Sequence, residues 1–211
     1  MKTESKRGRP RQFDEEIVLD QIMQVFWRHG YAATSLDQIA AATGLNRPSL
    51  YSAFGSKKAM YLKVIERFAD QMHIHLREAG LTQTGANARM KEILSAAIDL
   101  YTGKSFHTDA AYGCFAITTL PAEIMDDAEF QSALSQVLTR TDRGFASLIR
   151  YEANGTMAEQ DIQEVAQQLA LVLHGLSIRA RAGDPPDLLK RLAASAVDRL
   201  LPETSKSVVE S

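Results

Sequence analysis

Residues 34–54, TSLDQIAAATGLNRPSLYSAF, contain two short helical patterns on either side of Gly44. Thr34 and Ser35 precede the first helix, with Asp37 and Gln38 placed to complete a capping box, and Asn46 can cap the second. Two short helices joined around a glycine predict a helix-turn-helix, whose second helix is narrow enough to enter the major groove of DNA. A plain helical hairpin has the same spacing and is the alternative.

The polar positions of the second helix are the candidates for DNA contact. The apolar residues of both helices are expected to bury the inner faces of the hairpin. Phosphates and base edges then lie within reach of four side chains, which are Arg47, Ser49, Tyr51 and Ser52.

The sequence on both sides of this unit extends the pattern. Residues 1–12, MKTESKRGRPRQ, are polar and basic, so they predict a flexible arm. From Asp14, which can cap a helix, apolar residues recur at helical spacing as far as Gly30. After Ser56 a long helical pattern runs to about residue 79.

The remaining sequence predicts more amphipathic helices and no strands. Residues 104–127 give no clear prediction, and residues 202–211 are typical of a frayed tail. The chain is therefore expected to be all-α. The further helices are expected at residues 90–103, 130–154, 162–178 and 188–201.

The charge of the chain divides unevenly along its length. Residues 1–58 hold 9 Lys and Arg against 6 Asp and Glu, a net charge of +3. Residues 59–211 hold 15 against 20, a net charge of −5, so the formal total is −2. The positive N-terminal part is the one that suits a polyanion such as DNA.

Cys114 is the single cysteine of the sequence, which excludes an intrachain disulfide, a CxxC redox pair and a thiolate-rich zinc site. No apolar run approaches the roughly 18 residues of a membrane span. We therefore expect a cytoplasmic protein with no membrane partner, no metal and no cofactor. No catalytic motif is present, and the alternative function is a thiol-dependent redox or conjugating enzyme that uses Cys114.

The string TSLDQIAAATGLNRPSLYSAFGSKKAMYLKVIERF, residues 34–68, resembles the DNA-binding region of the TetR family of bacterial transcriptional repressors. The resemblance extends over about residues 13–68. It implies a ligand-responsive regulator, a homodimer that binds a pseudo-palindromic operator and is released by a small molecule. It also implies four parts, namely a basic arm at 1–12, a helix-turn-helix domain at 13–58, a helical effector-binding and dimerisation domain at 59–201, and a flexible tail at 202–211.

The resemblance assigns roles to individual residues of the DNA-binding region. Thr34, Tyr51 and Lys57 match positions that contact phosphate in relatives. Arg47 and Ser49 match the exposed start of the recognition helix. A lysine near a helix N-terminus is unfavourable for the helix dipole, which a phosphate partner would explain, although an ordinary solvated lysine is the alternative for Lys57.

This chain departs from the family pattern after Tyr51. Relatives often carry an aromatic residue and a histidine where Ser52 and Ala53 stand, and Gly55 replaces a more usual lysine. Small residues at these positions favour sequence reading by Arg47, by hydroxyl contacts and by the N-terminal arm.

The arm itself contains the sequence RGRPR at residues 7–11. Arg7, Arg9 and Arg11 resemble the core of an AT-hook, in which arginines lie in a narrow minor groove of A·T-rich DNA. A solubilising tail with no DNA contact is the alternative.

The effector site is expected within the helical domain, among aromatic, sulfur-bearing and polar residues on mainly apolar segments. Simple packing in the core is the alternative for each of them. For Cys114, the choices are a redox-sensing thiol and an inert buried one. The candidates are Phe68, Met72, His75, Tyr101, Phe106, Tyr112, Cys114, Phe115, Phe145 and His174.

The last two predicted helices have apolar faces wide enough to serve both a core and a partner. Alanines on both helices allow close helix approach. In the TetR family such a pair forms a homodimer through four helices, and two-fold symmetry then predicts a pseudo-palindromic DNA site.

Overall fold

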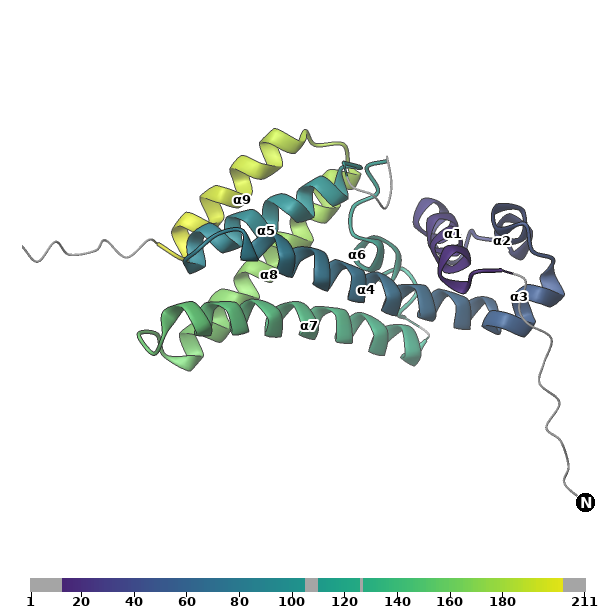
Figure 1. The fold of residues 1–211 in the computed structure, drawn as a ribbon, viewed down its shortest axis with the longest axis horizontal. Coiled ribbons are helices and arrows are strands. Elements are labelled where there is room, and N and C mark those ends of the chain that lie inside the picture. Colours follow the sequence, from purple (N-terminus) through teal and green to yellow (C-terminus); the bar gives the residue numbers. More distant parts are fainter. Residues whose placement is uncertain (1–12, 105–109, 126, 203–211) are drawn as a thin grey trace, which may run out of the picture.

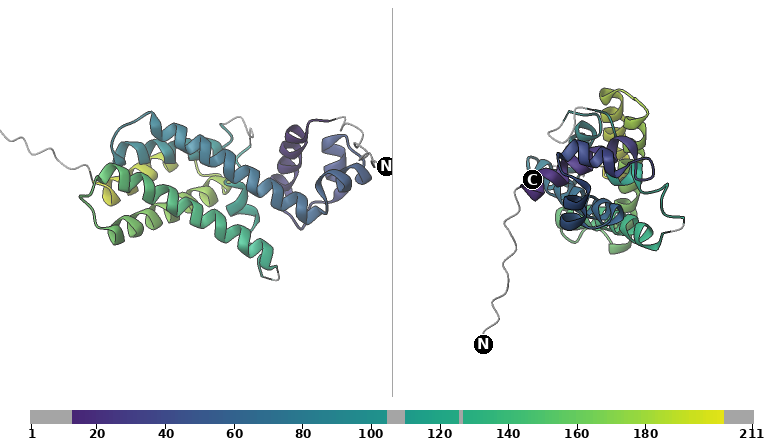
Figure 2. Two further views of the ribbon diagram at one scale, coloured as in Figure 1. Left: turned by 60° about the horizontal axis from the view of Figure 1, so that its bottom comes forward. Right: turned by 90° about the vertical axis from the view of Figure 1, so that its right-hand side faces the viewer.

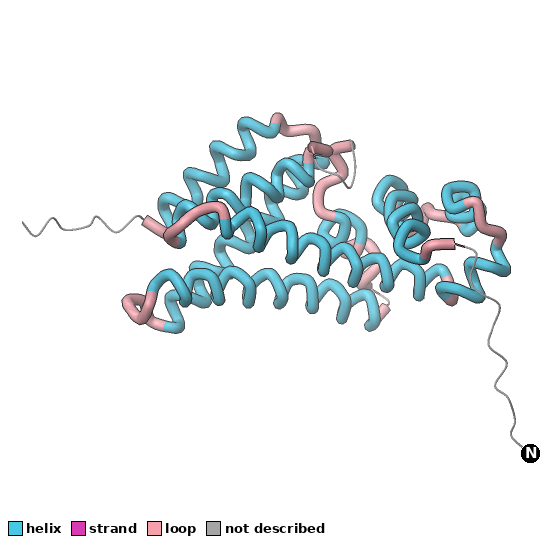
Figure 3. Tube along the Cα trace, viewed as in Figure 1, coloured by secondary structure: helices cyan, strands magenta, loops and turns pink. Residues whose placement is uncertain are grey.

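The computed structural model describes residues 13–104, 110–125 and 127–202. Within these ranges every regular element is a helix, as Figure 3 shows, and the all-α prediction is confirmed. The helices in chain order are α1 (Glu15–His29), α2 (Leu36–Thr43), α3 (Arg47–Phe54), α4 (Lys57–Leu81), α5 (Ala86–Tyr101), α6 (Phe115–Thr119), α7 (Ala128–Ala153), α8 (Glu159–Arg181) and α9 (Pro186–Leu200).

Helices α1, α2 and α3 form a compact unit, the head, at one end of the elongated molecule (Figure 1). The predicted capping box is present, since the Gln38 N–H donates to Ser35 Oγ at 3.2 Å and the Ser35 N–H donates to Gln38 Oε1 at 2.7 Å. Asp14 caps α1 and Asn46 caps α3, as predicted. Gly44 has a φ of 67°, a left-handed conformation that lets α2 end sharply before α3.

Helix α4 connects the head with the rest of the molecule (Figure 1). Ser56 caps its start by accepting a hydrogen bond from the Ala59 N–H at 3.1 Å. Its 25 residues continue two positions beyond the predicted end, to Leu81, and span about 37 Å. The two ends of this single helix belong to the head and to the bundle.

The bundle consists of α5, α7, α8, α9 and the second half of α4, and the left view of Figure 2 shows it beside the head. Helix α8 packs against α7 and α9, and α5 packs against α4 and α9. The partly buried Arg89 ties α5 to α7 through Glu152, with Nη1 2.6 Å from Oε1. The core of the bundle is therefore shared by helices that are distant in sequence.

Residues 104–127, which gave no sequence prediction, contain the short helix α6. Gly113, at φ 71°, lets the chain lie directly against α8, because a Cβ there would be 2.6 Å from the Ser177 carbonyl oxygen. The Cys114 N–H donates to Ser177 Oγ at 2.7 Å. This contact fixes α6 between the bundle and the head.

Candidate nucleic-acid interface and cavity

Helix α3, the predicted recognition helix, is held by its apolar side and presents its polar side to solvent. Leu50 and Phe54 are buried in the head. Tyr51 is 51% exposed, Ser52 is exposed and Ser49 is half-buried. The four predicted contact residues on α3 therefore begin at its N-terminus and continue along one accessible helix, a surface that fits a DNA groove.

Arg47 is accessible but already paired in this structure. Its Nε and Nη2 donate to the two carboxylate oxygens of Asp37 at 2.7 and 2.5 Å, a fork that joins the first turns of α2 and α3. The hydrogen bonds from Arg47 hold the pKa of Asp37 below its usual value. Both side chains are more than half exposed, so this pair contributes little to stability and can exchange for a DNA partner.

Thr34 and Lys57 have internal partners that the sequence did not indicate. Thr34 is 2% exposed and its hydroxyl donates to the Gly30 carbonyl at 2.6 Å, which fixes the turn between α1 and α2. Lys57 Nζ lies 4.5 Å from the centre of the Tyr31 ring and donates to the Ala32 carbonyl at 3.4 Å. Burial lowers the pKa of Lys57. The structure thus gives Thr34 a structural role and holds the half-buried Lys57 against the α1–α2 turn.

The predicted arm contacts Arg7, Arg9 and Arg11 lie outside the described residues, as does Phe106 among the candidates for the effector site.

A cluster of rings and charges joins the head to the bundle, and we term it the junction. Tyr31 of the α1–α2 turn lies 4.8 Å from the Phe130 ring of α7, measured between centroids. The Tyr61 hydroxyl of α4 donates to Thr119 Oγ1 of α6 at 2.6 Å. Lys58 Nζ lies 2.7 Å from Glu129 Oε1 at the start of α7. Through these contacts the start of α4 is held to the bundle as well as to the head.

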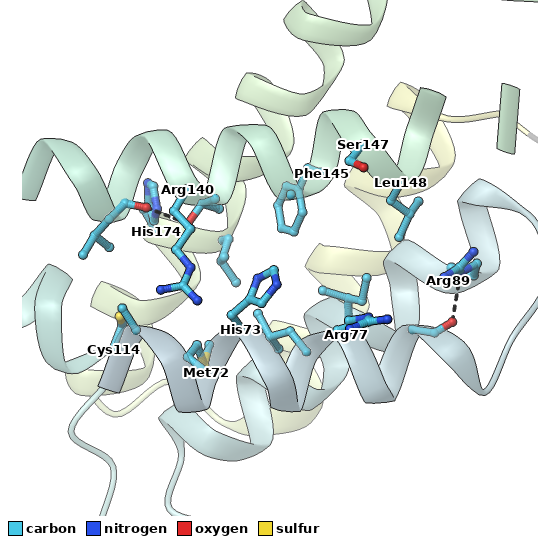
Figure 4. A pocket seen from close by; sticks show the side chains of 18 of the residues that line it. Met72, His73, Arg77, Arg89, Cys114, Arg140, Phe145, Ser147, Leu148 and His174 are labelled. Atoms are coloured by element: carbon cyan, nitrogen blue, oxygen red, sulfur yellow. Dashed lines mark hydrogen bonds between the residues drawn. The ribbon is translucent and has the colours of Figure 1, made fainter. Parts of the chain in front are cut away.

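The bundle encloses a cavity of about 560 Å³, which opens between α4 and α7. This volume is within the range of sites for small molecules. Figure 4 shows Phe145 and Arg140 entering from α7 and His73 from α4. The apolar part of the lining is formed by buried or partly buried side chains, including Phe68, Met72, Leu76, Ile93, Tyr101, Ile117, Val137, Phe145, Leu148 and Leu173.

Six of the nine described effector candidates line this cavity, and three do not. Tyr112 and Phe115 pack against Trp27 of α1, at 6.4 and 5.8 Å between ring centroids, because the loop around α6 turns them towards the head. His75 is half-buried on α4, two residues beyond His73, so it lies on a different face of the helix from the cavity. The six that line the cavity are Phe68, Met72, Tyr101, Cys114, Phe145 and His174.

Sequence reasoning missed the cationic side of the cavity. His73, Arg77, Arg89 and Arg140 all line it, and none was a candidate. One feature of the sequence could have indicated this side of the cavity. His73 and Arg77 have i, i+4 spacing, which places both on one face of α4 together with Gly80. Arg140 could not be assigned, because only the tertiary fold brings α7 opposite α4.

Cys114 has the environment of an inert thiol. It is buried, and burial raises the pKa of its thiol to about 11. A reactive cysteine needs the opposite shift, because the thiolate is the nucleophile. Within the described ranges, no group of three or more His, Cys, Asp or Glu side chains is placed to hold a metal ion.

Helices α8 and α9 keep large apolar side chains on their outer surface. Leu171 and Ile178 are 71% and 53% exposed and lie seven residues apart, on one face of α8. Leu192 of α9 is 44% exposed. None of the helices described is long and apolar enough to cross a bilayer.

Comparison with known proteins decides the family. Residues 18–64 match the family model described as bacterial regulatory proteins, tetR family. The HTH-type transcriptional repressor ComR of Escherichia coli (strain K12) is 32% identical over 205 residues, which cover 95% of this chain and 94% of ComR. The chain belongs to the TetR family.

Two further members of the TetR family support the match over most of the chain. The repressor BdcR of the same Escherichia coli strain is 25% identical over 189 residues, 90% of each chain. A cysteine variant of the TetR family regulator CifR, solved in complex with a 26bp double-strand operator DNA, has 29% identity and a TM-score of 0.78. That likeness covers 92% of this chain and 100% of CifR.

The chain is accordingly a DNA-binding transcriptional regulator of the TetR family. Its relatives are regulators and not enzymes. Together with the high pKa of Cys114, this favours the regulator over the thiol-dependent enzyme.

Proposed function

We propose that this TetR-family protein is a homodimeric repressor, which binds a pseudo-palindromic operator through α3 and is released by a small molecule bound in the cavity. One observation carries the proposal. The same 25-residue helix, α4, follows the recognition helix directly and lines the cavity with Phe68, Met72 and His73. A ligand that changes the position of α4 must therefore change the position of the head.

The exposed side of α3 supports operator binding. Arg47, Ser49, Tyr51 and Ser52 supply one guanidinium and three hydroxyl groups, which suit base edges and phosphates. Lys57 and the arm arginines add positive charge along the same end of the chain. ComR and BdcR carry the word repressor in their names, which supports repression here.

The outer faces of α8 and α9 support a dimer. Exposed Leu171, Ile178 and Leu192 form an apolar surface on two neighbouring helices, and a two-fold axis would bury it against its copy. We expect Leu171→Glu to convert the dimer to a monomer in sedimentation experiments. Ile17→Glu is the matched control, because Ile17 is likewise an exposed apolar residue but lies on α1 of the head, and it should leave the dimer intact.

The junction supports release by a ligand. Ile117 and Cys114 line the cavity, whereas Phe115 and Thr119 of the same segment contact Trp27 and Tyr61. A ligand with a higher affinity for one arrangement of these helices would shift the population of head positions. Release then requires only that the two heads of the dimer no longer match their half-sites.

The test is selection of fragments of the source genome on the full-length protein at fixed, near-physiological salt, where non-specific binding is weak. We expect enrichment of one pseudo-palindrome whose half-sites are about one helical turn or a multiple of it apart. Recovery of fragments without a shared sequence, from folded protein, would overturn the proposal.

A further inference from the structure

The cavity has a strong asymmetry of charge. Three arginines and two histidines line it, namely Arg77, Arg89, Arg140, His73 and His174, and none of its described lining residues is an aspartate or a glutamate. Elsewhere in the lining, apolar and aromatic side chains predominate. A ligand that fits this lining has an apolar body and a negatively charged group.

The partners of the arginines show where that charge belongs. Arg89 already has two partners, since it donates to the Gly80 carbonyl at 3.0 Å and to Glu152 at 2.6 Å in a partly buried pair. Arg140 pairs with Asp70 at 2.6 Å, but both side chains are 40% or more exposed. Such a surface pair is worth little and exchanges readily for a better partner. Arg77 has no ion pair among the residues that the structure describes.

His73 lies between the two available arginines. In Figure 4 its ring and the Arg140 guanidinium extend from α4 and α7 into the same gap and lie next to one another. Burial, then the positive charges of Arg140 and Arg77, lower the pKa of His73, while Asp70 opposes them in part. A neighbouring hollow shares His73 and Arg140 with the cavity and adds Arg143. Its described lining residues also include no aspartate or glutamate. The opening is thus a region of positive potential with donors that face a common space.

We propose that the effector is an amphipathic organic acid, with its apolar body between Phe68, Phe145 and Leu173 and its carboxylate at His73, Arg77 and Arg140. This inference rests on the proposed function, because it names the ligand class of the same cavity. The carboxylate takes the place of Asp70 on Arg140 and adds a partner for Arg77. A neutral ligand of the same shape leaves Arg140 with Asp70 and gives Arg77 no partner, whereas a cationic ligand adds positive charge beside both arginines.

Matched ten-carbon probes on the full-length protein test the ligand class. Sodium decanoate, 1-decanol and decyltrimethylammonium share the apolar chain and differ in the charge of the head group. We expect isothermal titration calorimetry below the critical micelle concentrations to show decanoate binding tighter than decanol by about tenfold or more, because charge-assisted hydrogen bonds add to the same apolar burial. Butanoate, with the acid but little apolar chain, should bind far more weakly.

Substitutions locate the acid. Arg77→Gln and Arg140→Gln should each reduce decanoate affinity several-fold and leave decanol affinity unchanged, a difference that general loss of folding cannot produce. Arg28→Gln, on the exposed surface of α1 far from the cavity, is the control and should change neither. Equal binding of decanol, or of decyltrimethylammonium, overturns the inference, as does decanoate binding that is insensitive to both substitutions.

Operator binding is measured separately, so that the two proposals can fail independently. If the protein binds a specific operator but does not bind decanoate, the proposed ligand class is wrong and the proposed function stands. If the protein binds decanoate but recognises no operator, the ligand class stands and the proposed function is wrong.

Discussion

The head and the bundle distribute their functional residues in opposite ways. In the head, the side chains proposed to contact DNA lie within six residues on one short helix, namely Arg47, Ser49, Tyr51 and Ser52. In the bundle, the cavity takes its lining from five helices, between Phe68 and His174. A surface on one capped helix is specified by local sequence, whereas a cavity exists only after distant helices have packed. Substitutions in the head and in the bundle should therefore have separable effects, except at the contacts that couple the two regions.

The largest expected effect is at the ring cluster that the two regions share. Phe115 lies 5.8 Å from the rings of Trp27, Tyr61 and Phe68, between centroids. Phe115→Ala should lower the free energy of unfolding by about 3–5 kcal/mol because it leaves a cavity in a dense core. Urea denaturation should show one transition by circular dichroism and by fluorescence of Trp27, the single tryptophan. Tyr151→Ala, on the surface, is the control. Two separate transitions, with only the fluorescence one shifted, would show that head and bundle fold independently.

Arg47→Ala should have the next largest effect, and only in the head. If Arg47 makes a bidentate contact with a base, its loss should reduce discrimination between operator and mismatched sites by about 1–3 kcal/mol. Asp37→Asn is the companion variant, because it removes the charge that holds Arg47 in the free protein, and it should strengthen DNA binding. Binding assays with single-base operator variants measure both. If Arg47→Ala leaves the base preference unchanged at every operator position, Arg47 does not contact a base.

Tyr61→Phe should cost about 1 kcal/mol of stability, because it removes one buried hydrogen bond, from the hydroxyl to Thr119. Chemical denaturation measures the loss. Tyr51→Phe is a matched control on the exposed side of α3 and should leave stability unchanged. An equal loss of stability in the two variants would contradict the hydrogen bond between Tyr61 and Thr119 as a stabilising contact of the junction.

Lys57→Ala tests whether Lys57 contacts a DNA phosphate or only stabilises the head through its internal contacts. If Lys57 contacts one phosphate, the slope of log affinity against log salt should decrease in magnitude by about 1, with weaker binding to all DNA. Lys91→Ala, on α5 of the bundle, should leave the slope unchanged. A normal slope in the Lys57 variant, with lower thermal stability, would assign this residue to its contacts with Tyr31 and Ala32 alone.

The smallest effect concerns pH and the bundle. Burial lowers the pKa of His174, and Asp142 offsets part of this shift. Unfolded chains take up the proton near pH 6.5, before the folded protein does, so stability is complete above that pH and falls as the pH drops towards the folded pKa. His174→Gln should flatten the dependence of unfolding free energy on pH in this window. The same substitution at the exposed His29 of the head is the control, and an equal flattening there would contradict the account.

The sequence predicted the head nearly in full. Caps at Asp14, Ser35 and Asn46 and the turn at Gly44 are local signals, and each is present as predicted. What it could not predict is the internal use of Thr34, because that depends on how the chain returns to the Gly30 carbonyl.

The bundle was predicted as helices, and six of the nine described effector candidates line its cavity, but the cationic side of that cavity was not predicted. Helix α6, with five residues, is too short for a helical period to be visible. The arginines of the cavity were missed because charged residues on an amphipathic helix are ordinarily solvated, and only the packing of α7 opposite α4 turns Arg140 inwards. The periodicity of a sequence predicts each helix separately and does not predict which other helix packs against it.

The central claim is that the exposed side of α3 reads DNA sequence as part of a dimer. The most direct measurement is a fluorescence anisotropy titration of the selected operator against a scrambled duplex of equal length, at one near-physiological salt concentration, with the stoichiometry from sedimentation. We expect two chains per operator, or a multiple of two, and an affinity for the operator that is about a thousandfold or more higher than for the scrambled duplex. Equal affinity for the two duplexes, or one chain per site, would contradict it.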